Sequence, residues 1–268
     1  SWMSCAAPST EAAPTAGSSA GSEKAGPGLA ESGAPPRQRM IYGRRVGPRL
    51  RPGRKRLLET LLPRLAITLP EVGQLEPRSL FARPVEAVRL EIGFGAGEHL
   101  EAEAVAHPEQ GFLGVEPFLS GVARLLAGIE ARGLDNVRIL VDDARLLLRA
   151  LPDASLARID VLFPDPWPKA RHHKRRIVAP ATVAEMARVL APGGELRLAT
   201  DDPGYARWML RAILGEPRLE WLAERAADWR TPWSDRPITR YEAKALAAGR
   251  RPVYFRCRRR EIERIGLA

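Results

Sequence analysis

From residue 87 onward, short apolar segments alternate with longer segments whose apolar residues recur at helical spacing. The short segments predict strands at 87–92, 111–115, 137–141, 158–163 and 195–199, and two more near 218–222 and 252–257. The longer segments predict helices at 98–106, 119–132, 144–151, 181–190 and 205–214. Such an alternation is typical of an α/β fold with a mostly parallel seven-stranded sheet and helices on both faces. Ligands of these sheets bind beyond the carboxyl ends of the strands, so the residues at those ends form the candidate site.

Two segments of different character precede the predicted domain. Residues 1–36 consist largely of Ala, Pro, Gly and Ser, and we expect a disordered low-complexity tail. Residues 37–56 carry nine cationic side chains and no acid, and their glycines and prolines should prevent a helix. We interpret them as a basic arm that could become ordered on a partner. A helix at 57–69 is expected to begin the single folded domain, which extends over 57–268.

The chain is strongly basic, with a net charge of +10 and an isoelectric point near 10.4. The location of the cations is more informative than their total, because three runs contain no acid. These are 37–56, 169–176 and 250–260, with nine, five and six cations respectively. A charge run is usually a solvated face, but three acid-free runs in one chain predict a polyanionic partner such as a nucleic acid.

The sequence also bears on the compartment in which the protein works. No apolar run approaches the ~20 residues that are needed to cross a bilayer, and the N-terminus lacks the layout of a secretory signal. The two cysteines, Cys5 and Cys257, do not suggest a disulfide framework or a zinc site. These features predict a cytoplasmic protein with no membrane partner.

The first predicted strand runs into the sequence Glu-Ile-Gly-Phe-Gly-Ala-Gly. Gly93, Gly95 and Gly97 would let the backbone turn tightly and approach a ligand at the N-terminus of a helix. A dinucleotide-binding loop would have glycine or alanine at the next position, where Glu98 would instead face the pyrophosphate. Glu91 indicates a ligand with a cationic group. The alternative is an ordinary strand-to-helix turn that binds nothing.

Acids also follow the second and third predicted strands. Glu116 lies 19 residues after Gly97, a distance at which an acid suits bidentate hydrogen bonding to ribose hydroxyls. Asp142, Asp143 and Ala144 follow the third strand, where a single acid is more often a helix cap than a ligand contact. Together with the glycine loop, these acids describe a nucleoside site without a phosphate. S-adenosylmethionine fits that description, since it has a sulfonium, an ammonium, a ribose and an adenine.

After the fourth predicted strand comes Phe-Pro-Asp-Pro-Trp-Pro-Lys-Ala-Arg-His-His-Lys-Arg-Arg, at 163–176. Its one carboxylate, Asp165, stands between two prolines, and five cations come soon after it. Trp167 could stack on an RNA base or cover the floor of the pocket as a core residue. His172 and His173 lack a supporting cysteine or acid cluster, so no metal site is expected.

The motifs LEIGFGAG, FLGVE, DDA, FPDPWPKARHHKRR, LATD and TRYE together resemble those of the bacterial tRNA (guanine-N7-)-methyltransferases, over roughly residues 40–257. The glycine loop is similar to the cofactor loop of class I methyltransferases. This resemblance implies a Rossmann-like class I methyltransferase fold, S-adenosylmethionine as the cofactor and tRNA as the partner. It further implies methylation of N7 of guanosine 46 in the tRNA variable loop, and it leaves both a monomer and a homodimer open.

The resemblance also implies roles for single residues. Asp165 matches the proposed catalytic residue. The positions that match the cofactor site are Glu91, Gly93, Gly95, Gly97, Glu116, Asp143 and Ala144, with Glu91 near the methionine part, Glu116 at the ribose and Asp143 at the adenine amine. The positions that match the substrate site are Lys169, Asp201, Thr239, Arg240, Tyr241 and Glu242. The cations expected to contact tRNA phosphates are Arg171, Lys174, Arg175 and Arg176.

The chemistry of the reaction restricts what the acids can do. Guanine N7 already carries a free lone pair, so no general base is needed, and catalysis should rest on positioning and on fixed negative groups. Asp165 and Asp201 are expected to accept hydrogen bonds from guanine N1–H and the exocyclic amine. Two other hypotheses stay open: a methyltransferase of small molecules, which would not need three cationic runs, and a non-catalytic RNA-binding protein, which need not keep all the acids.

Overall fold

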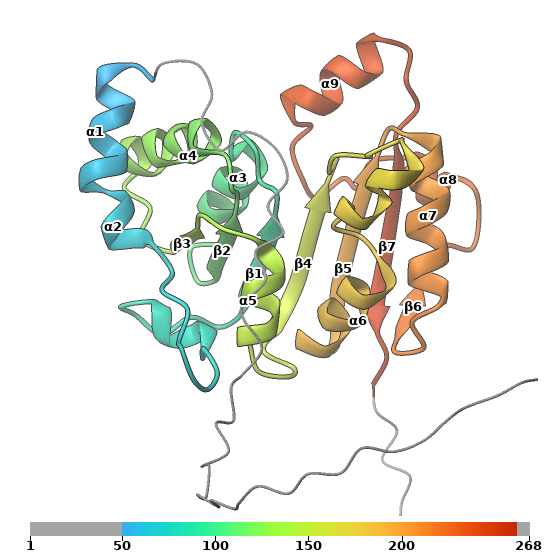
Figure 1. The fold of residues 1–268 in the computed structure, drawn as a ribbon, viewed down its shortest axis with the longest axis horizontal. Coiled ribbons are helices and arrows are strands. Elements are labelled where there is room, and N and C mark those ends of the chain that lie inside the picture. Colours follow the sequence, from blue (N-terminus) through green and yellow to red (C-terminus); the bar gives the residue numbers. More distant parts are fainter. Residues whose placement is uncertain (1–49, 262–268) are drawn as a thin grey trace, which may run out of the picture. The chain divides into compact units, whose positions relative to one another are not determined.

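The computed structural model describes residues 50–261 of the chain (Figure 1). The expected tail at 1–36 and the first part of the expected basic arm, 37–49, lie outside the described residues. Within the described part, one sheet has the strand order β3-β2-β1-β4-β5-β7-β6. Its strands are β1 (Val88–Ile92), β2 (Gly111–Val115), β3 (Val137–Leu140), β4 (Leu156–Leu162), β5 (Leu190–Thr200), β6 (Leu219–Trp221) and β7 (Val253–Arg259).

The sheet is mostly parallel, as the alternation predicts. β1 pairs in parallel with β2 and β4, β2 with β3, and β4 with β5, whereas β7 runs antiparallel to both β5 and β6. From β1 the chain moves outward through β2 to β3, and it then returns to place β4 on the other side of β1. The reversal of strand order therefore lies between β1 and β4, which is where open α/β sheets bind their ligands.

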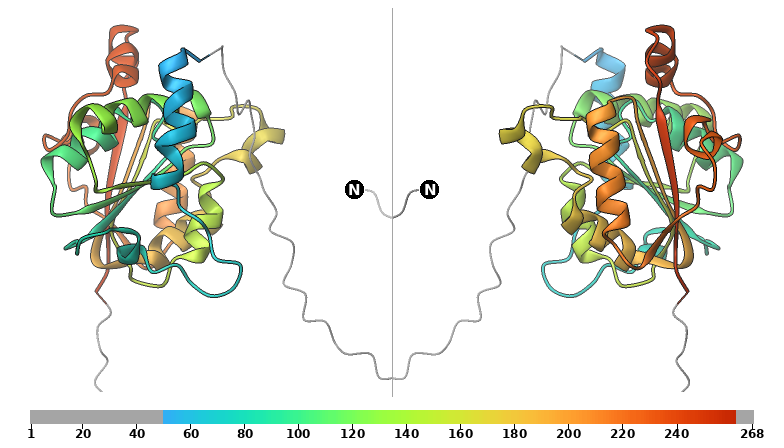
Figure 2. Two further views of the ribbon diagram at one scale, coloured as in Figure 1. Left: turned by 90° about the vertical axis from the view of Figure 1, so that its left-hand side faces the viewer. Right: turned by 90° about the vertical axis from the view of Figure 1, so that its right-hand side faces the viewer.

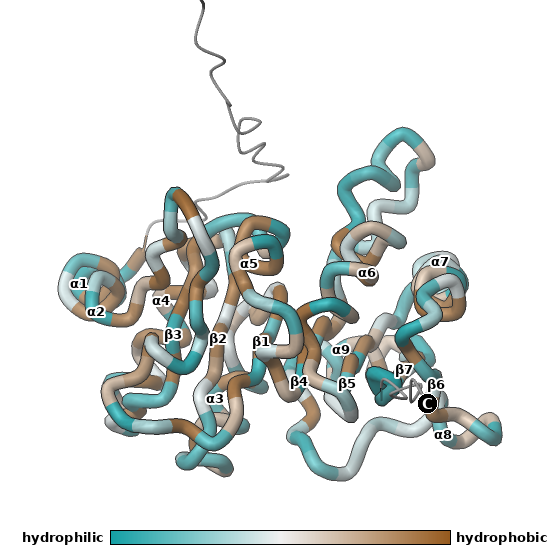
Figure 3. The backbone as a smooth tube through the Cα atoms, turned by 90° about the horizontal axis from the view of Figure 1, so that it is seen from below, coloured by the Kyte–Doolittle hydropathy of each residue, from teal (hydrophilic) through white to brown (hydrophobic). Residues whose placement is uncertain are grey.

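Helices cover both faces of the sheet (Figure 3). Each face has its own hydrophobic cluster. One cluster joins the sheet to α5 (Ala144–Ala150), α6 (Pro180–Val189) and α7 (Pro203–Leu214). The other joins it to α1 (Pro52–Thr60), α2 (Leu62–Leu65), α3 (Glu98–Ala106) and α4 (Leu119–Arg132). The remaining short elements are α8 (Ala227–Arg230), α9 (Arg240–Ala247) and the 3₁₀ turns η1 (Pro77–Leu80) and η2 (Ala170–Arg175).

The first helix begins earlier than the sequence analysis expects. The helix expected at 57–69 is in fact α1, which starts at Pro52, followed by α2, which ends at Leu65. Pro52 occupies the first helical turn, where its missing N–H is not needed and its fixed φ favours the helix. Beyond α2, Ala66 pairs with Ile139 at the β3 edge of the sheet. Residues 52–56, assigned to the basic arm, therefore belong to a helix of the folded part.

A second difference concerns the junction of α6 and β5. The helix ends at Val189, and β5 already begins at Leu190, although the sequence predicts a strand only from 195. Of the extra residues, Leu190 pairs with Leu156 at the start of β4, and the register then shifts so that Arg158 pairs with Glu195.

Among residues 50–261, no helix is both long enough and apolar enough to cross a membrane.

Candidate active site

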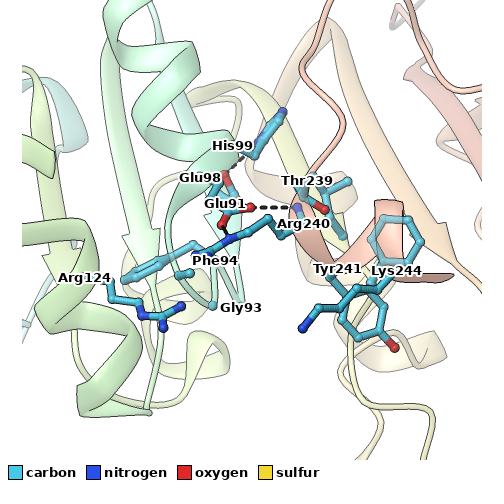
Figure 4. Close-up of a pocket in the computed structure, with 14 residues that line it drawn as sticks. Glu91, Gly93, Phe94, Glu98, His99, Arg124, Thr239, Arg240, Tyr241 and Lys244 are labelled. Carbon is cyan, nitrogen blue, oxygen red and sulfur yellow. Dashed lines mark hydrogen bonds and ion pairs between the residues drawn. The ribbon is translucent and has the colours of Figure 1, made fainter. Parts of the chain in front are cut away.

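The carboxyl ends of β1 to β4 border two cavities that share several lining residues. The first, here called the β2–β3 cavity, is lined by Glu116, Asp142, Asp143, Ala144, Asp165, Trp167 and their neighbours. The second, the β1–α9 cavity, is lined by Glu91, Glu98, His99, Arg124, Arg240 and their neighbours (Figure 4). Gly93, Gly95, Phe163 and Tyr241 line both. The structure thus brings residues that follow the first four predicted strands to one edge of the sheet.

The glycine loop between β1 and α3 has the backbone geometry that its sequence predicts. Gly93, Gly95 and Gly97 have φ angles of 75°, 55° and 81°, in the left-handed region that glycine tolerates best. A Cβ atom on Gly93 or Gly95 would meet no atom within 4 Å. It would therefore point into the open space of the cavities, which a bound molecule could fill. The shape of the loop therefore suits close approach of a ligand to its backbone.

Glu116, directly after β2, is buried and already partly engaged. Its Oε2 accepts a hydrogen bond from the Gly95 N–H at 2.8 Å, and its Oε1 accepts one from the Phe118 N–H at 2.9 Å. Burial raises the pKa of Glu116, the two backbone hydrogen bonds oppose this, and the nearby charge of Asp165 adds to the rise. A carboxylate has about four lone-pair sites, so each oxygen can still accept a hydroxyl proton.

Asp143, after β3, is both a helix cap and a cavity residue. Its side chain accepts a hydrogen bond from the Arg145 N–H at 2.9 Å, which caps α5. The Arg145 guanidinium also contacts both carboxylate oxygens, at 3.2 and 3.1 Å. The general expectation that an acid in this place caps a helix is therefore correct. It does not conflict with a ligand contact, because Asp143 and Ala144 also line the β2–β3 cavity.

Glu91, the one acid in β1, is paired with a histidine that the sequence analysis did not single out. Its Oε2 lies 2.8 Å from Nδ1 of His99, and both side chains are buried. Burial lowers the pKa of His99, but the charge of Glu91 and the hydrogen bond to it outweigh burial and raise the pKa overall. The spacing of His99 on the first turn after the glycine loop is the only signal in the sequence that could have indicated this pair.

A cluster of buried charges lies next to this pair, within the sheet and α3. The Arg158 guanidinium donates to Asp160 at 2.8 Å and also pairs with Glu103. Arg89 donates to the same Glu103 at 2.7 Å. Charges buried in this way need mutual pairing, since an isolated ion in the interior is costly. The cluster fixes the region beneath Glu91 and His99.

Asp165 lies in a backbone turn with unusual torsion angles. Phe163 and Trp167 have backbone φ angles of 51° and 42°. Residues other than glycine adopt this region rarely, at a cost of roughly 1–3 kcal/mol each. Asp165 between them is exposed, and among residues 50–261 its carboxylate makes no hydrogen bond or ion pair. Trp167 is half-buried, lines the β2–β3 cavity and has the Arg175 guanidinium 4.8 Å from its ring.

The cations after this turn differ in their exposure to solvent. Lys169, Arg171 and Lys174 are exposed, on or next to η2, which projects from the carboxyl edge (Figure 2). Burial lowers the pKa of His172, and the surrounding cations lower it further, a sign of a dense positive field. Arg176, by contrast, is buried, although the sequence analysis expects it at the surface in contact with a tRNA phosphate.

Arg176 is only 4% exposed, and its partners are inside the protein. Its Nε donates to the Pro166 carbonyl at 2.8 Å, and its Nη2 lies 3.4 Å from the Trp167 carbonyl. Its guanidinium stacks 4.9 Å from the Tyr205 ring and 4.8 Å from the Trp208 ring. The predicted role of Arg176 on the tRNA backbone is replaced by a structural one, because this side chain holds the turn that carries Asp165.

The predicted substrate segment 239–242 begins α9, and its residues have different surroundings. Thr239 caps the helix, accepting from the Glu242 N–H at 3.3 Å, and Tyr241 is exposed, with its ring 5.4 Å from that of Phe163. Glu242 is fully buried, pairs with Arg236 at 2.8 Å and accepts from the Tyr254 hydroxyl at 2.5 Å. This burial contradicts a direct substrate contact for Glu242.

Asp201, after β5, is also engaged by neighbours. It forms an ion pair of 2.6 Å with Arg250, and the Tyr241 hydroxyl lies 3.5 Å from its Oδ1. The two strand-end acids expected to orient guanine therefore differ, since the Asp165 carboxylate is open and that of Asp201 is shared.

The cationic run at 250–260 does not form one surface. β7 is antiparallel, so only its beginning, near Arg250 and Arg251, lies at the carboxyl edge of the parallel strands. Arg256 pairs with Glu195, and Arg259 is buried against the carbonyls of Arg188 and Leu190. Part of this run therefore stabilises the fold instead of facing a partner.

No cluster of three or more His, Cys, Asp or Glu residues with the geometry of a metal site occurs within 50–261.

Two basic side chains that the sequence analysis assigned to the arm also lie near the site. Arg51 and Arg54 line a third cavity together with Arg124, beside Gly95 and Gly121. A positive surface thus borders the glycine loop as well as the turn at Asp165.

Comparison with known proteins agrees with these observations. The sequence model of a family described as "Putative methyltransferase" matches residues 85–255. The tRNA (guanine-N(7)-)-methyltransferase of Nitrobacter hamburgensis is 54% identical over 222 residues, which cover 83% of this chain and 87% of the relative. The protein of the same name from Rhodospirillum rubrum is 52% identical over 229 residues, covering 84% and 90%.

Solved structures resemble the chain more distantly. TrmN from Thermus thermophilus has a TM-score of 0.47 and 19% identity, and the match covers 65% of this chain and 44% of that chain. A likeness at this level says nothing about substrate.

The strand order, with β7 as the antiparallel strand of the described sheet, is that of the predicted Rossmann-like class I methyltransferase fold. With a family match over more than half of its length and relatives above 50% identity along most of it, the chain belongs to the tRNA (guanine-N(7)-)-methyltransferase family.

Proposed function

We propose that the protein transfers a methyl group from S-adenosylmethionine to N7 of a guanosine in tRNA, at position 46 of the variable loop, to give 7-methylguanosine. The observation that carries the proposal is the position of Asp165. Its open carboxylate lines the β2–β3 cavity and is followed by exposed cations along the chain. The names of the relatives support the reaction, and the family resemblance supports the position in tRNA.

The β2–β3 cavity and the glycine loop fit S-adenosylmethionine by their shape and by their acceptors. The open space over Gly93 and Gly95 is where a side chain would otherwise project. Glu116 retains lone pairs for two ribose hydroxyls, and Asp143 lies in the same cavity for the adenine amine. Glu91 offers a carboxylate to the ammonium of the methionine part. When bound, this cofactor supplies a methyl group on a cationic sulfur.

Asp165 acts by orienting guanine and not by taking a proton. N7 of guanine is already nucleophilic, and the methylated purine carries a positive charge. A fixed carboxylate that accepts from N1–H and the exocyclic amine holds the base in one orientation and stabilises the developing cation. Asp165 is better suited to this role than Asp201, because Arg250 already occupies the Asp201 carboxylate. Asp201 then supports Tyr241 at the wall of the site.

The RNA around the target base is held by side chains that have no acid partner in the described part of the chain. Lys169, Arg171 and Lys174 lie on one side of Asp165, and Arg51 and Arg54 lie beyond the glycine loop. Phosphate contacts of this kind fix the position of an RNA without reading its sequence. They would place the variable loop over the two cavities.

The experiment is methylation of unmodified tRNA with labelled S-adenosylmethionine, followed by nucleoside analysis. We expect label in 7-methylguanosine, and none in a tRNA whose position 46 is adenosine. Label in another nucleoside, or equal labelling of both tRNAs, would overturn the proposal. A small-molecule methyltransferase would show cofactor binding without labelling of tRNA, and a non-catalytic RNA-binding protein would bind tRNA but not the cofactor.

A further inference from the structure

Glu98 and Arg240 join two distant parts of the chain at the mouth of the β1–α9 cavity (Figure 4). Glu98 is the first residue of α3, directly after the glycine loop, and Arg240 is the first residue of α9. The Glu98 Oε2 accepts from the Arg240 backbone N–H at 2.8 Å, and its Oε1 pairs with the Arg240 guanidinium. One carboxylate thus contacts both the backbone and the side chain of Arg240.

This contact differs from the others that hold α9. Tyr241 packs against Phe163 and approaches Asp201, and Glu242 is buried against Arg236, so these residues tie α9 to the β4, β5 and β7 side. Among the hydrogen bonds, ion pairs and ring contacts within residues 50–261, those of Glu98 are the ones that tie α9 to the glycine loop.

The charge of Glu98 is suited to the contact. Burial of the carboxyl would raise its pKa, but the hydrogen bonds and charge of Arg240 outweigh this and keep the pKa of Glu98 below its usual value. The carboxylate is therefore ionised at neutral pH. It also lies at the N-terminus of α3, where a negative charge is favourable.

We propose that Glu98 is a positioning residue that fixes segment 239–242 relative to the glycine loop, and so sets where the target base lies relative to the methyl donor. The inference rests on the proposed function, in which the loop holds the donor and the segment borders the acceptor. Methyl transfer needs the nucleophile in line and close to the donor, and a small misplacement costs rate while binding survives. Glu98 supplies this alignment without touching the reacting atoms.

The test is a comparison of Glu98→Ala with the wild type in single-turnover and steady-state methylation of tRNA. We expect kcat to fall about tenfold, from the loss of a charge-assisted hydrogen bond and a partly exposed ion pair. The KM for tRNA and the Kd for S-adenosylmethionine should stay near their wild-type values. Glu98→Gln, which keeps an oxygen for the Arg240 N–H, should lie between the two.

Glu101→Ala is the matched control, because Glu101 is on the same helix but pairs with Arg132 of α4 and not with a residue of α9. It should leave kcat unchanged. A double-mutant cycle with Arg240→Ala should show that the two losses are not additive, as expected for partners in one contact.

Two results would overturn the inference. Unchanged kcat in Glu98→Ala would show that the contact does not position the segment. Tighter tRNA binding or faster turnover would show that Glu98 instead occupies Arg240 in the place of an RNA phosphate. A wild type that fails to methylate tRNA would count against the proposed function and is seen in the same assay, so the two failures are distinguishable. Thermal unfolding of both Glu98 variants shows whether either simply fails to fold.

Discussion

The carboxyl edge of the sheet is built differently on its two sides. On the β1–β3 side the acids are buried and already held, Glu116 by two backbone N–H groups, Asp143 by Arg145 and Glu91 by His99. On the β4 side Asp165 is exposed and its carboxylate has no partner within residues 50–261. A site whose groups are already fixed binds a small molecule without paying for their ordering. A site whose groups are open takes its partners from the substrate, which is what a large RNA can supply.

The largest effect should come from the open side. Asp165→Ala removes the carboxylate proposed to orient guanine, so kcat should fall by about 10²–10³-fold, while S-adenosylmethionine binds as before. Single-turnover methylation and calorimetric titration of the cofactor measure the two quantities. Asp165→Asn keeps the shape but not the charge and separates orientation from electrostatic stabilisation. A large loss of cofactor affinity would show that the two sides are not separate.

The converse change on the held side is Glu116→Ala. It removes two acceptors for the ribose and also frees the Gly95 N–H, so cofactor affinity should fall by about 30–100-fold. Binding of tRNA in the absence of cofactor should not change. Calorimetry and a tRNA filter-binding assay give the two values. Weakened tRNA binding in this variant would argue against the division between the two sides.

Within the cationic stretch, Arg176 and Lys174 make the comparison sharper. Arg176→Ala leaves the Pro166 and Trp167 carbonyls without their donor and should lower the free energy of unfolding by about 2 kcal/mol. Lys174→Ala should leave stability unchanged but reduce the salt slope of tRNA binding by about 0.7, the value for one single-strand phosphate. Denaturant unfolding and binding at several salt concentrations measure both. Equal behaviour of the two variants would contradict the assignment of Arg176 to the fold.

The smallest effect concerns the pair of Glu91 and His99, with Asp160 and Glu103 nearby. The folded-state pKa of His99 is raised, so the stability it contributes is complete below its unfolded pKa of about 6.5 and is lost as pH rises through the folded value. The difference in unfolding free energy between wild type and His99→Gln should therefore shrink with rising pH above about 6.5. Chemical denaturation across that range tests it, and a difference that grows with pH would reverse the sign assigned to the pair.

The comparison also explains what the sequence could predict. The strand-end residues Glu91, Glu116, Asp143 and Asp165 were found because parallel strands bring their carboxyl ends to one edge, whatever the side chains around them. The strands themselves follow from apolar periodicity, which is a local property. The glycine loop follows from torsion angles that few other residues adopt. These features depend on backbone rules that one stretch of sequence contains in full.

The rest depended on contacts between distant stretches. Arg176 looks like its exposed neighbours in the sequence, and only the packing of Tyr205 and Trp208 makes it internal. Nothing in the sequence near Glu242 indicates that Arg236 and Tyr254 of β7 enclose its carboxylate. In the sequence, Glu98 indicates only a departure from a dinucleotide-binding loop, because its partner Arg240 is 142 residues away. The sequence predicts a later start for this helix because proline usually interrupts helices, although in α1 Pro52 occupies the first turn, where proline is favourable.

The two residues with positive φ around Asp165 have a consequence for how this chain can change. Phe163 and Trp167 hold conformations that glycine would adopt with less strain, so replacing either by glycine would relax the backbone at that point. Pressure for thermal robustness alone would therefore favour a looser turn, and the loss would appear in turnover and not in folding. The turn is a place where durability and activity oppose each other, and variants selected only for heat resistance should be checked there first.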